Sequence, residues 1–363
     1  MKKKVEKVRV ELGERSYNIV IGSNILSSIG ASLKPFGFSP KVAVVSNPTV
    51  YPLYGGVVTT SLEKAGFDIL TVTIPDGEEY KDLLWVEHIY NMLLKAKLDR
   101  SSCIVALGGG VIGDITGFVA STYMRGISYI QMPTTLLAQV DSSVGGKTGV
   151  NHKLGKNMIG TFWQPRLVWV DVETLKTLQK REFLAGIAEV IKYGVIWDEE
   201  LFDFLEAKRK KILSLNREAL TYVIKRSCEI KAEVVSKDER ESGLRAILNF
   251  GHTIGHAIET VTGYRKYLHG EAVAIGMHLE AKLAGMLNLF DDRKTLRIKA
   301  LIDAYNLPSE MPQGIDVDHI LSSMQLDKKA VAGKLRFVLP EKIGKVRIQK
   351  GVAEKVIRVL LKS

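Results

Sequence analysis

Apolar and polar positions follow two different rhythms along the chain. In the first half, short apolar runs rich in Val, Ile and Leu alternate with stretches of helical periodicity. The apolar runs predict buried strands at 41–47, 68–75 and 102–107, and the periodic stretches predict helices that end near 65 and cover 81–97. Strand–helix alternation is typical of a parallel sheet covered by helices. The earlier segments 5–12 and 17–21 predict an added hairpin.

The rhythm changes after residue 177. Strand patterns nearly vanish until 334–339, and helical periodicity dominates five segments: 182–195, 200–215, 217–235, 252–262 and 271–287. The sequence therefore predicts two domains, an α/β domain over residues 1–177 and a mainly α-helical domain over residues 178–363.

Composition narrows the class of protein. The chain has 363 residues, of which 46% are hydrophobic and 25% charged, as in globular proteins. No apolar run approaches the roughly 18 residues of a membrane span. The two cysteines, Cys103 and Cys228, exclude a disulfide framework and a cysteine-built zinc site, and they favour a reducing compartment. Since Met1–Lys4 is followed by the charged segment 5–9 instead of an apolar core, we expect no export and a cytoplasmic location.

The net charge of +11 calls for an explanation in terms of partners. The basic residues form no single tract, and several lie inside Gly-rich or apolar segments. A solvated basic surface is one reading. The scatter favours an anionic substrate in a cleft over a nucleic-acid-binding module, whose basic residues would gather on one stripe.

A glycine-rich turn follows the third α/β strand. Residues 108–114 read Gly-Gly-Gly-Val-Ile-Gly-Asp and satisfy G-x-G-x-x-G between a predicted strand and a predicted helix. Such glycines let the backbone approach a pyrophosphate, and the helix N-terminus offers N–H groups to it. The pattern predicts a Rossmann-like nucleotide site, with a purely structural turn as the alternative. No acidic residue follows about twenty positions later, but Asp76, beyond the preceding strand, is placed to supply one.

A second Gly-rich region covers 141–160. Its Gly-Gly-Lys-Thr segment imitates the end of a P-loop, but the first glycine of that motif is missing, so the P-loop interpretation fails. Lys147, Lys153 and Lys156 in flexible backbone still suit a phosphate or carboxylate. An exposed loop is the alternative, and His152 by itself is a surface residue.

The helical half holds a cluster of potential metal ligands. His252 and His256 are four residues apart on one predicted helix face, and His269 begins the next helix. Glu189 and Lys192 share a face of an earlier helix whose small neighbours leave room for a ligand. Two histidines and one carboxylate with open positions fit a catalytic divalent metal, although H-E-x-x-H is absent. Any one of these histidines alone is more often a hydrogen-bonded core residue, and only the cluster favours a metal.

Lys231 interrupts an apolar stripe. Leu220, Ile224, Cys228 and Val235 repeat at helical spacing, and Lys231 falls among them. A lysine at such a position either extends its amine to solvent or meets an anion. Arg245 and Asn249 lead into His252 at spacings that suit the same cavity.

Together these segments resemble the 3-dehydroquinate synthase family over nearly the whole chain. The blocks that carry the resemblance are 76–81, 108–114, 122–126, 133–143, 146–149, 155–157, 189–194, 249–256 and 269–271. The resemblance implies a homodimeric enzyme with NAD as a recycled cofactor and one divalent metal, zinc or cobalt. It implies that Glu189, His252 and His269 bind the metal.

The resemblance also assigns the other site residues. The residues that would line NAD are Asp76, Gly77, Glu78, Glu79, Tyr80, Lys81, Gly110, Val111, Ile112, Gly113, Asp114, Thr134, Thr135, Asp141, Lys147, Lys156, Thr174, Leu175, Lys176 and Thr177. Those that would meet the substrate are Arg125, Lys147, Asn157, Lys192, Lys231, Arg245, Asn249, His256 and one of Lys328 and Lys329. Arg125 would reach the site of the neighbouring subunit.

The implied reaction is the second step of the shikimate pathway, which leads to chorismate and the aromatic amino acids. A phosphate-eliminating lyase of this family converts 3-deoxy-D-arabino-heptulosonate 7-phosphate to 3-dehydroquinate and phosphate. NAD-mediated oxidation, phosphate elimination, reduction and an intramolecular aldol closure follow one another. The alternatives are another sugar phosphate cyclase and a metal-dependent polyol dehydrogenase, which would release NADH and has less need of the many lysines.

Overall fold

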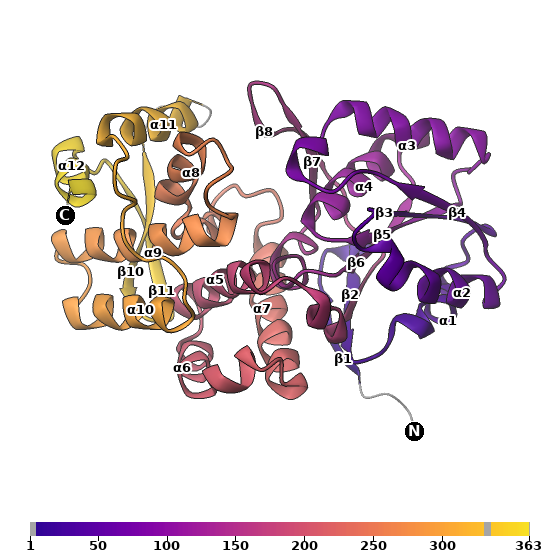
Figure 1. Ribbon diagram of the computed structural model, residues 1–363, viewed down its shortest axis with the longest axis horizontal. Coiled ribbons are helices and arrows are strands. Elements are labelled where there is room, and N and C mark those ends of the chain that lie inside the picture. Colours follow the sequence, from indigo (N-terminus) through magenta and orange to yellow (C-terminus); the bar gives the residue numbers. More distant parts are fainter. Residues whose placement is uncertain (1–4, 330–334, 363) are drawn as a thin grey trace. The chain divides into compact units, whose positions relative to one another are not determined.

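The computed structural model describes residues 5–329 and 335–362, apart from the side chains of 326–329. The chain forms two compact units (Figure 1). Unit 1 contains Met1–Leu178 and Leu220–Arg240, and unit 2 contains Gln179–Ala219 and Glu241–Ser363. The sequence placed the boundary after residue 177 and gave 220–240 to the helical domain, whereas the structure packs this segment with unit 1.

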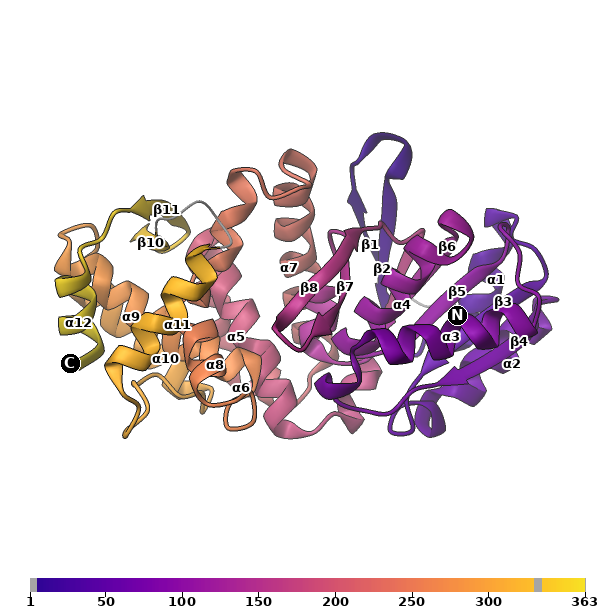
Figure 2. The ribbon, with the colours of Figure 1, turned by 90° about the horizontal axis from the view of Figure 1, so that it is seen from above.

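Unit 1 is built on a seven-stranded sheet in the order β1-β2-β9-β6-β5-β3-β4. Its strands are β1 Val5–Val10, β2 Tyr17–Gly22, β3 Lys41–Ser46, β4 Asp68–Thr73, β5 Cys103–Gly108, β6 Ser128–Pro133 and β9 Leu167–Asp171. The pair β1–β2 is antiparallel, and every other neighbouring pair is parallel. Figure 2 shows the β1–β2 hairpin projecting from the sheet. The predicted α/β fold with an added hairpin is confirmed.

Helices cover both faces of this sheet because its strands are apolar on both sides. Val42 and Val44 share one core with apolar residues of two helices, and Ala43 and Val45 share another core with apolar residues of two others. The first pair of helices is α1 Ile29–Leu33 and α2 Gly56–Lys64, and the second is α3 Leu83–Lys95 and α4 Gly110–Thr122 (Figure 1).

The second Gly-rich region forms a hairpin. Strands β7 (Lys147–His152) and β8 (Gly155–Phe162) pair antiparallel, with Gly149 opposite Gly160. A Cβ atom at Gly149 would lie 2.7 Å from the carbonyl oxygen of Ile159, and one at Gly160 would lie 2.5 Å from that of Thr148. The two glycines therefore let the backbones of the strands approach closely. The segment is therefore a two-stranded hairpin, with a register shift between Val150 and His152, and not the loop that the sequence left as an alternative.

Helix α7 (Arg217–Lys237) joins unit 1 through polar contacts with segments distant in the sequence. Lys225 Nζ lies 2.9 Å from a carboxylate oxygen of Glu6 on β1, and the N–H of Glu11 donates to Ser236 Oγ at 3.2 Å. Local periodicity predicts the helix but not these partners. For this reason the sequence grouped α7 with the helical domain, whereas the structure groups most of it with unit 1.

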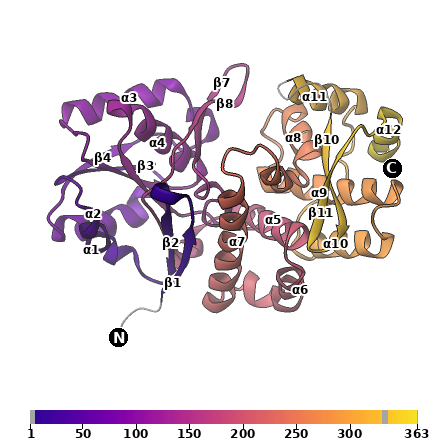
Figure 3. The ribbon, with the colours of Figure 1, turned by 180° about the vertical axis from the view of Figure 1, so that it is seen from behind.

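Unit 2 is mainly helical, as predicted. Its elements are α5 Lys180–Ile196, α6 Glu199–Leu213, α8 His252–Val261, α9 His269–Met286, α10 Asp292–Ala304, α11 Val317–Lys329, α12 Glu354–Lys362 and the antiparallel strands β10 Arg336–Lys342 and β11 Lys345–Lys350. Helix α9 is buried along most of its length and contacts α5, α8, α10 and α12 (Figure 3). It is the central helix of this unit.

Two glycines let α9 pack closely against its neighbours. A Cβ atom at Gly270 would lie 1.9 Å from the carbonyl oxygen of Ala185 on α5, and one at Gly276 would lie 1.9 Å from that of Gly251, which precedes α8. No larger residue fits at either position without a backbone shift. These contacts hold α5, α8 and α9 at the separation that the site below requires.

No helix in the described part of the chain is both long enough and apolar enough to span a membrane.

Candidate active site

Three potential metal ligands meet in unit 2. One donor atom each from Glu189, His252 and His269 lies within 4.8 Å of the other two. Glu189 lies in the middle of α5, whereas the two histidines are the first residues of α8 and α9. Since these are the helices that the close glycine contacts draw together, the packing of unit 2 itself assembles the cluster.

Each imidazole presents Nε2 to the carboxylate. His252 Nε2 and His269 Nε2 each lie 3.6 Å from Glu189 Oε1. Glu189 has no exposed surface, and its other oxygen pairs with Nζ of Lys192, one helical turn further along α5. The lysine supplies the positive charge that a fully buried carboxylate needs.

The two histidines differ in protonation. Burial and the positive charge of Lys192 outweigh Glu189 and hold the pKa of His252 well below its usual value. Burial also opposes a charge on His269, but the carboxylates of Glu189 and Glu259 outweigh it and raise the pKa of His269 to about 10. A positive charge is thus favourable between these carboxylates, and two imidazole nitrogens with one carboxylate oxygen suit zinc or cobalt. The donor set fits a divalent cation.

Three further predicted residues of unit 2, Arg245, Asn249 and His256, lie near His252 in the sequence. His256 is exposed, with its ring centroid 5.3 Å from that of His252 and 5.9 Å from that of His269. Arg245 is buried in the segment that precedes α8, and Asn249 donates to Glu241 Oε1 at 2.8 Å. The predicted side chains of Lys328 and Lys329, at the end of α11, lie outside the described residues.

Sequence reasoning missed two carboxylates here. Glu259 contacts His269, and Glu241 contacts Asn249. Glu259 stands seven residues after His252 and three after His256, so the helical spacing that joined the histidines also placed Glu259 on their face. Nothing in the local pattern identified Glu241.

Four of the segments predicted to bind NAD follow parallel strands of unit 1, whereas the predicted Lys147 and Lys156 lie on the β7–β8 hairpin. Asp76 follows β4, Gly110 follows β5, Thr134 follows β6 and Thr174 follows β9. Because carboxyl ends of parallel strands meet at one edge of a sheet, the four segments lie along the same edge, where nucleotides bind to open α/β sheets. The segment 174–177 lies in a short 3₁₀ helix, and Tyr54 Oη donates to the Thr174 carbonyl at 3.1 Å.

The glycine turn has a packing role as well. Helix α4 begins at Gly110 with Gly109 as its N-cap. A Cβ atom would lie 2.7 Å from Ile112 if added to Gly108 and 2.7 Å from Gln131 Oε1 if added to Gly113, whereas at Gly110 it would lie 3.1 Å from Ser142 Oγ. The glycines therefore have the structural role of a tight turn, and this turn also directs the N-terminus of α4 to the edge of the sheet where the nucleotide site was predicted.

Lys81 ties the acidic segment to this turn. Its buried Nζ lies 2.5 Å from Asp114 Oδ2 and 2.6 Å from Asn157 Oδ1 on β8. Although burial opposes the charge, Asp114 and Glu78 outweigh it and raise the pKa of Lys81. Asp76 is exposed and accepts hydrogen bonds from Asn47 at 2.9 Å and Thr49 at 2.8 Å.

The anion that neutralises Lys231 is a carboxylate of the same chain, Asp141. The lysine Nζ lies 2.7 Å from Asp141 Oδ1 and 2.8 Å from the Asp141 carbonyl oxygen. The position of Lys231 on an apolar stripe therefore requires no external anion. Lys147 is exposed at the start of β7, and Arg125 is exposed in a turn where it has φ 69°.

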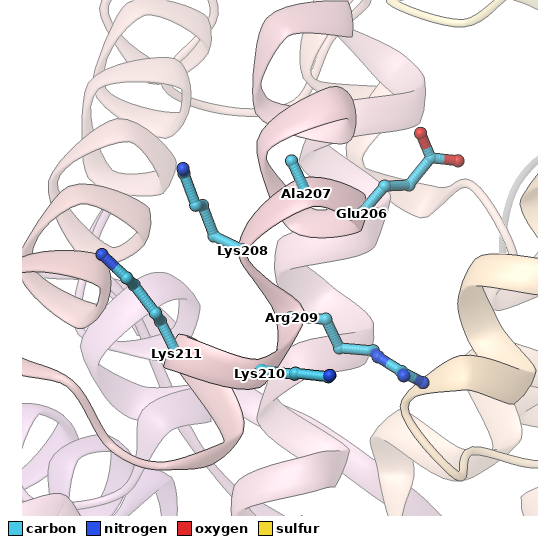
Figure 4. Close-up of a pocket in the computed structure, with 6 residues that line it drawn as sticks. All are labelled: Glu206, Ala207, Lys208, Arg209, Lys210 and Lys211. Carbon is cyan, nitrogen blue, oxygen red and sulfur yellow. The ribbon is translucent and has the colours of Figure 1, made fainter.

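A depression over the last turns of α6 is lined by residues 206–211 (Figure 4). It carries four basic side chains, but Lys208 and Lys211 extend to one side and Arg209 and Lys210 to the other. Arg209 donates to the carbonyl oxygen of Ala304 at 2.9 Å. The basic groups do not converge on a common point, and none of the predicted site residues lies there.

Solved structures with this fold hold both kinds of cofactor. The chain is similar to 2-epi-5-epi-valiolone synthase from Streptomyces hygroscopicus with NAD⁺ and Zn²⁺ bound, at a TM-score of 0.89 and 28% identity over 97% of each chain. It is also similar to 2-deoxy-scyllo-inosose synthase complexed with carbaglucose-6-phosphate, NAD⁺ and Co²⁺, at a TM-score of 0.86 and 27% identity over 98% of this chain and 99% of the other. The fold and the site define a sugar phosphate cyclase.

Sequence comparisons give the family within that class. The model of the 3-dehydroquinate synthase N-terminal domain matches residues 71–185, and that of the C-terminal domain matches residues 186–330. The curated 3-dehydroquinate synthase of Thermodesulfovibrio yellowstonii is 61% identical over 344 residues, which are 95% of this chain and 96% of that protein. The chain belongs to the 3-dehydroquinate synthase family, and the resemblance seen in the sequence is confirmed.

Proposed function

We propose that this protein converts 3-deoxy-D-arabino-heptulosonate 7-phosphate to 3-dehydroquinate and phosphate. The observation that carries the proposal is the 61% identity with a curated 3-dehydroquinate synthase over 95% of the chain. The donor cluster of unit 2 and the glycine turn of unit 1 support the proposal, since they would supply the two cofactor sites that this chemistry needs.

Glu189, His252 and His269 would hold the divalent metal, and the edge of the sheet in unit 1 would hold NAD. When bound, the metal lowers the pKa of a coordinated hydroxyl and NAD supplies a reversible hydride acceptor. Because His252 is held neutral, its ring nitrogen is available to a cation without loss of a proton.

The basic residues of unit 2 would bind and orient the substrate. Lys192 and Arg245 are almost completely buried, so water screens their charges little. Such groups hold carboxylate or phosphate oxygens in place and stabilise negative charge as it develops. His256, which is exposed beside His252, would move a proton between the substrate and solvent.

In unit 1, Lys147, Asn157 and Lys231 would add polar contacts to the substrate. The amide of Asn157 is oriented by Lys81, and Lys231 is oriented by Asp141. These contacts fix the side chains of Asn157 and Lys231 before the substrate binds, which lowers the entropy cost of binding.

We also propose that the protein works in the cytoplasm as a homodimer, with Arg125 of one subunit reaching the site of the other. The exposure of Arg125 in a sharp turn supports this role. We expect binding of the anionic sugar phosphate and of neither nucleic acid nor membrane, because the excess positive charge is scattered along the chain. Sedimentation equilibrium of the wild type and of Arg125→Ala tests the dimer, and the activity of the same two proteins tests the role of the arginine. The variant should remain a dimer and lose activity.

Phosphate release from the heptulosonate phosphate tests the reaction. We expect many turnovers in the presence of metal and of NAD⁺ far below the substrate concentration, without a lasting rise in NADH absorbance. Stoichiometric accumulation of NADH would instead indicate a polyol dehydrogenase. Turnover of a different sugar phosphate, with none of this one, would indicate another cyclase of the same fold.

A further inference from the structure

The two histidines of the candidate metal site are oriented in the same way. His252 Nδ1 lies 3.1 Å from the carbonyl oxygen of Phe250, and His269 Nδ1 lies 3.1 Å from Glu259 Oε2. In both rings Nε2 is the nitrogen that faces Glu189. An acceptor at Nδ1 requires the proton there, so Nε2 is the nitrogen that can offer a lone pair to a cation, in His269 once the second proton of the ring has left.

The acceptors differ in kind. His252 uses a backbone carbonyl two residues away, whereas His269 uses a carboxylate from another helix. Glu259 lies in the last turns of α8 and is 5% exposed, so its position is set by the packing of α8 and solvent competes little for its charge. His269 begins α9 and is the most exposed of the three donors, with a third of its side chain accessible. Its ring is therefore the one that packing restrains least.

We infer that Glu259 is a positioning residue, which fixes the ring of His269 with Nε2 toward the cation and makes that nitrogen a stronger donor. The inference rests on the proposed metal site and assigns a residue outside the three ligands. A carboxylate hydrogen-bonded to the remote nitrogen of a ligating histidine raises its basicity and fixes its tautomer.

A competing arrangement is a second cation held directly by Glu259. Donor atoms of His256, Glu259 and His269 also lie within 4.8 Å of one another. In that arrangement Nδ1 of His269 would bind metal instead of donating a hydrogen bond. The 3.1 Å contact with Glu259 and the exposure of His256 favour the positioning role.

Metal affinity of the folded protein tests the inference. We would measure zinc dissociation constants by competition with a chromophoric chelator, and the visible absorption spectrum of the cobalt-loaded protein, for Glu259→Ala and Glu259→Gln. Glu259→Ala should bind zinc about 10- to 100-fold more weakly and alter the cobalt spectrum. Glu259→Gln, whose amide oxygen still accepts the hydrogen bond, should recover part of the affinity. Binding should stay at one metal per chain throughout.

Two further variants separate the possible failures. His269→Ala should abolish tight binding, and if it does not, the proposed metal site itself is wrong. If His269→Ala loses the metal while both Glu259 variants bind zinc as the wild type does, the inference about Glu259 alone is overturned. A fall from two metals to one in Glu259→Ala would overturn it in favour of the second cation. Glu341→Gln, a partly exposed acid on β10, is the control for the loss of one carboxylate and should leave zinc affinity unchanged. Melting temperatures in excess chelator show whether each variant is folded.

Discussion

Lys231 and Asp141 neutralise each other across a sequence separation of 90 residues. The lysine is 5% exposed, and about a quarter of the aspartate side chain is accessible. A buried ammonium is costly unless an anion compensates it, so the pair stabilises the packing of α7 in unit 1. The same contact orients the lysine for the substrate role proposed above.

Removal of this charge should therefore affect stability as well as turnover. We expect Lys231→Met to lower the free energy of unfolding by about 1–3 kcal/mol, because Asp141 loses its partner while the apolar stem is kept. Urea denaturation of this variant, of Asp141→Asn and of the double variant measures the coupling. The double variant should lose less than the two single losses added together.

The control is Lys237→Met on the same helix. Lys237 is half exposed and pairs with Glu233 one turn away, an arrangement that contributes little. Strict additivity of Lys231→Met and Asp141→Asn, or an equal effect at Lys237, would contradict the role of the buried pair.

Glu280 is a buried acid that contacts the residue before His252 but is not one of the three metal-donor candidates. It lies on α9 without exposed surface, and its Oε2 accepts the N–H of Gly251 at 2.7 Å. Burial raises the pKa of Glu280 to about 8, although hydrogen bonds from the backbone N–H groups that begin α8 oppose the shift. The side chain thus anchors the helix that starts with His252.

This shift makes stability depend on pH. In the unfolded chain Glu280 has a pKa near 4.5, so between about pH 4.5 and 8 the folded protein retains a proton that the unfolded chain has released. The contribution of Glu280 to stability is complete below the lower value and is lost as the pH rises through the upper one. Relative to the wild type, Glu280→Gln should therefore gain stability from pH 5 to pH 8. Melting temperatures of both proteins in chelator check this, and parallel curves would mean that Glu280 stays ionised.

At the scale of elements, the contact between α5 and α9 sets the geometry of the site. Gly270 lies next to His269, and the carbonyl oxygen of Ala185 occupies the place of its missing Cβ. Since Glu189 is one turn further along α5, the separation of the two helices also sets the distance from Glu189 to His269. Packing and ligand geometry are determined by the same contact.

Gly270→Ala should consequently impair both. Overpacking typically costs about 1–3 kcal/mol, and a displaced α9 would move His269 away from Glu189. We expect a lower free energy of unfolding together with weaker zinc binding, measured by urea denaturation and chelator competition. Gly56→Ala on α2 is the matched control, because a Cβ there meets no atom within 4 Å. If Gly270→Ala bound zinc as tightly as the wild type does, the packing of α9 on α5 would not determine the geometry of the metal ligands, and the prediction would be wrong.

The sequence predicts elements well where one short-range rhythm dominates. The buried strands at 41–47 and 102–107 and the helices of unit 2 follow from periodicity. Residue type and spacing give the cluster of histidines with Glu189, whereas the choice of Glu189, His252 and His269 as the metal donors came from the family resemblance. The β7–β8 hairpin was left open because its glycines mark flexible backbone in isolation and act only when the two strands meet.

Pairings across long stretches of chain escape this reasoning. Neither the ion pair of Lys231 with Asp141 nor the packing of α7 against β1 leaves a trace in local pattern, because each depends on tertiary topology. Glu259 was within reach of the helical spacing. It was overlooked because its partner, His269, belongs to the next helix.

For the whole molecule, each unit should respond to its own ligand. Bound ligand stabilises the native state by mass action, and protection is concentrated in the segments that open together with the site. Zinc should slow amide hydrogen exchange in α5 and at the starts of α8 and α9, whereas NAD⁺ should slow it in the turn between β5 and α4. Exchange measured by mass spectrometry with each ligand alone tests this. Zinc protection confined to unit 1 would contradict the assignment, and His269→Ala should show no zinc effect.

Because most of helix α7 belongs to unit 1, this unit is built from two segments that are separate in the sequence. The helix runs without interruption from Arg217, in unit 2, into the residues 220–240 that complete unit 1. A fragment that stops at residue 178 would lack two residues that contact it. These are Cys228, whose thiol contacts the carbonyl oxygen of Gln139, and Lys231, which pairs with Asp141. Neither unit can therefore be cut out of the gene, or exchanged by recombination, as one uninterrupted stretch of coding sequence.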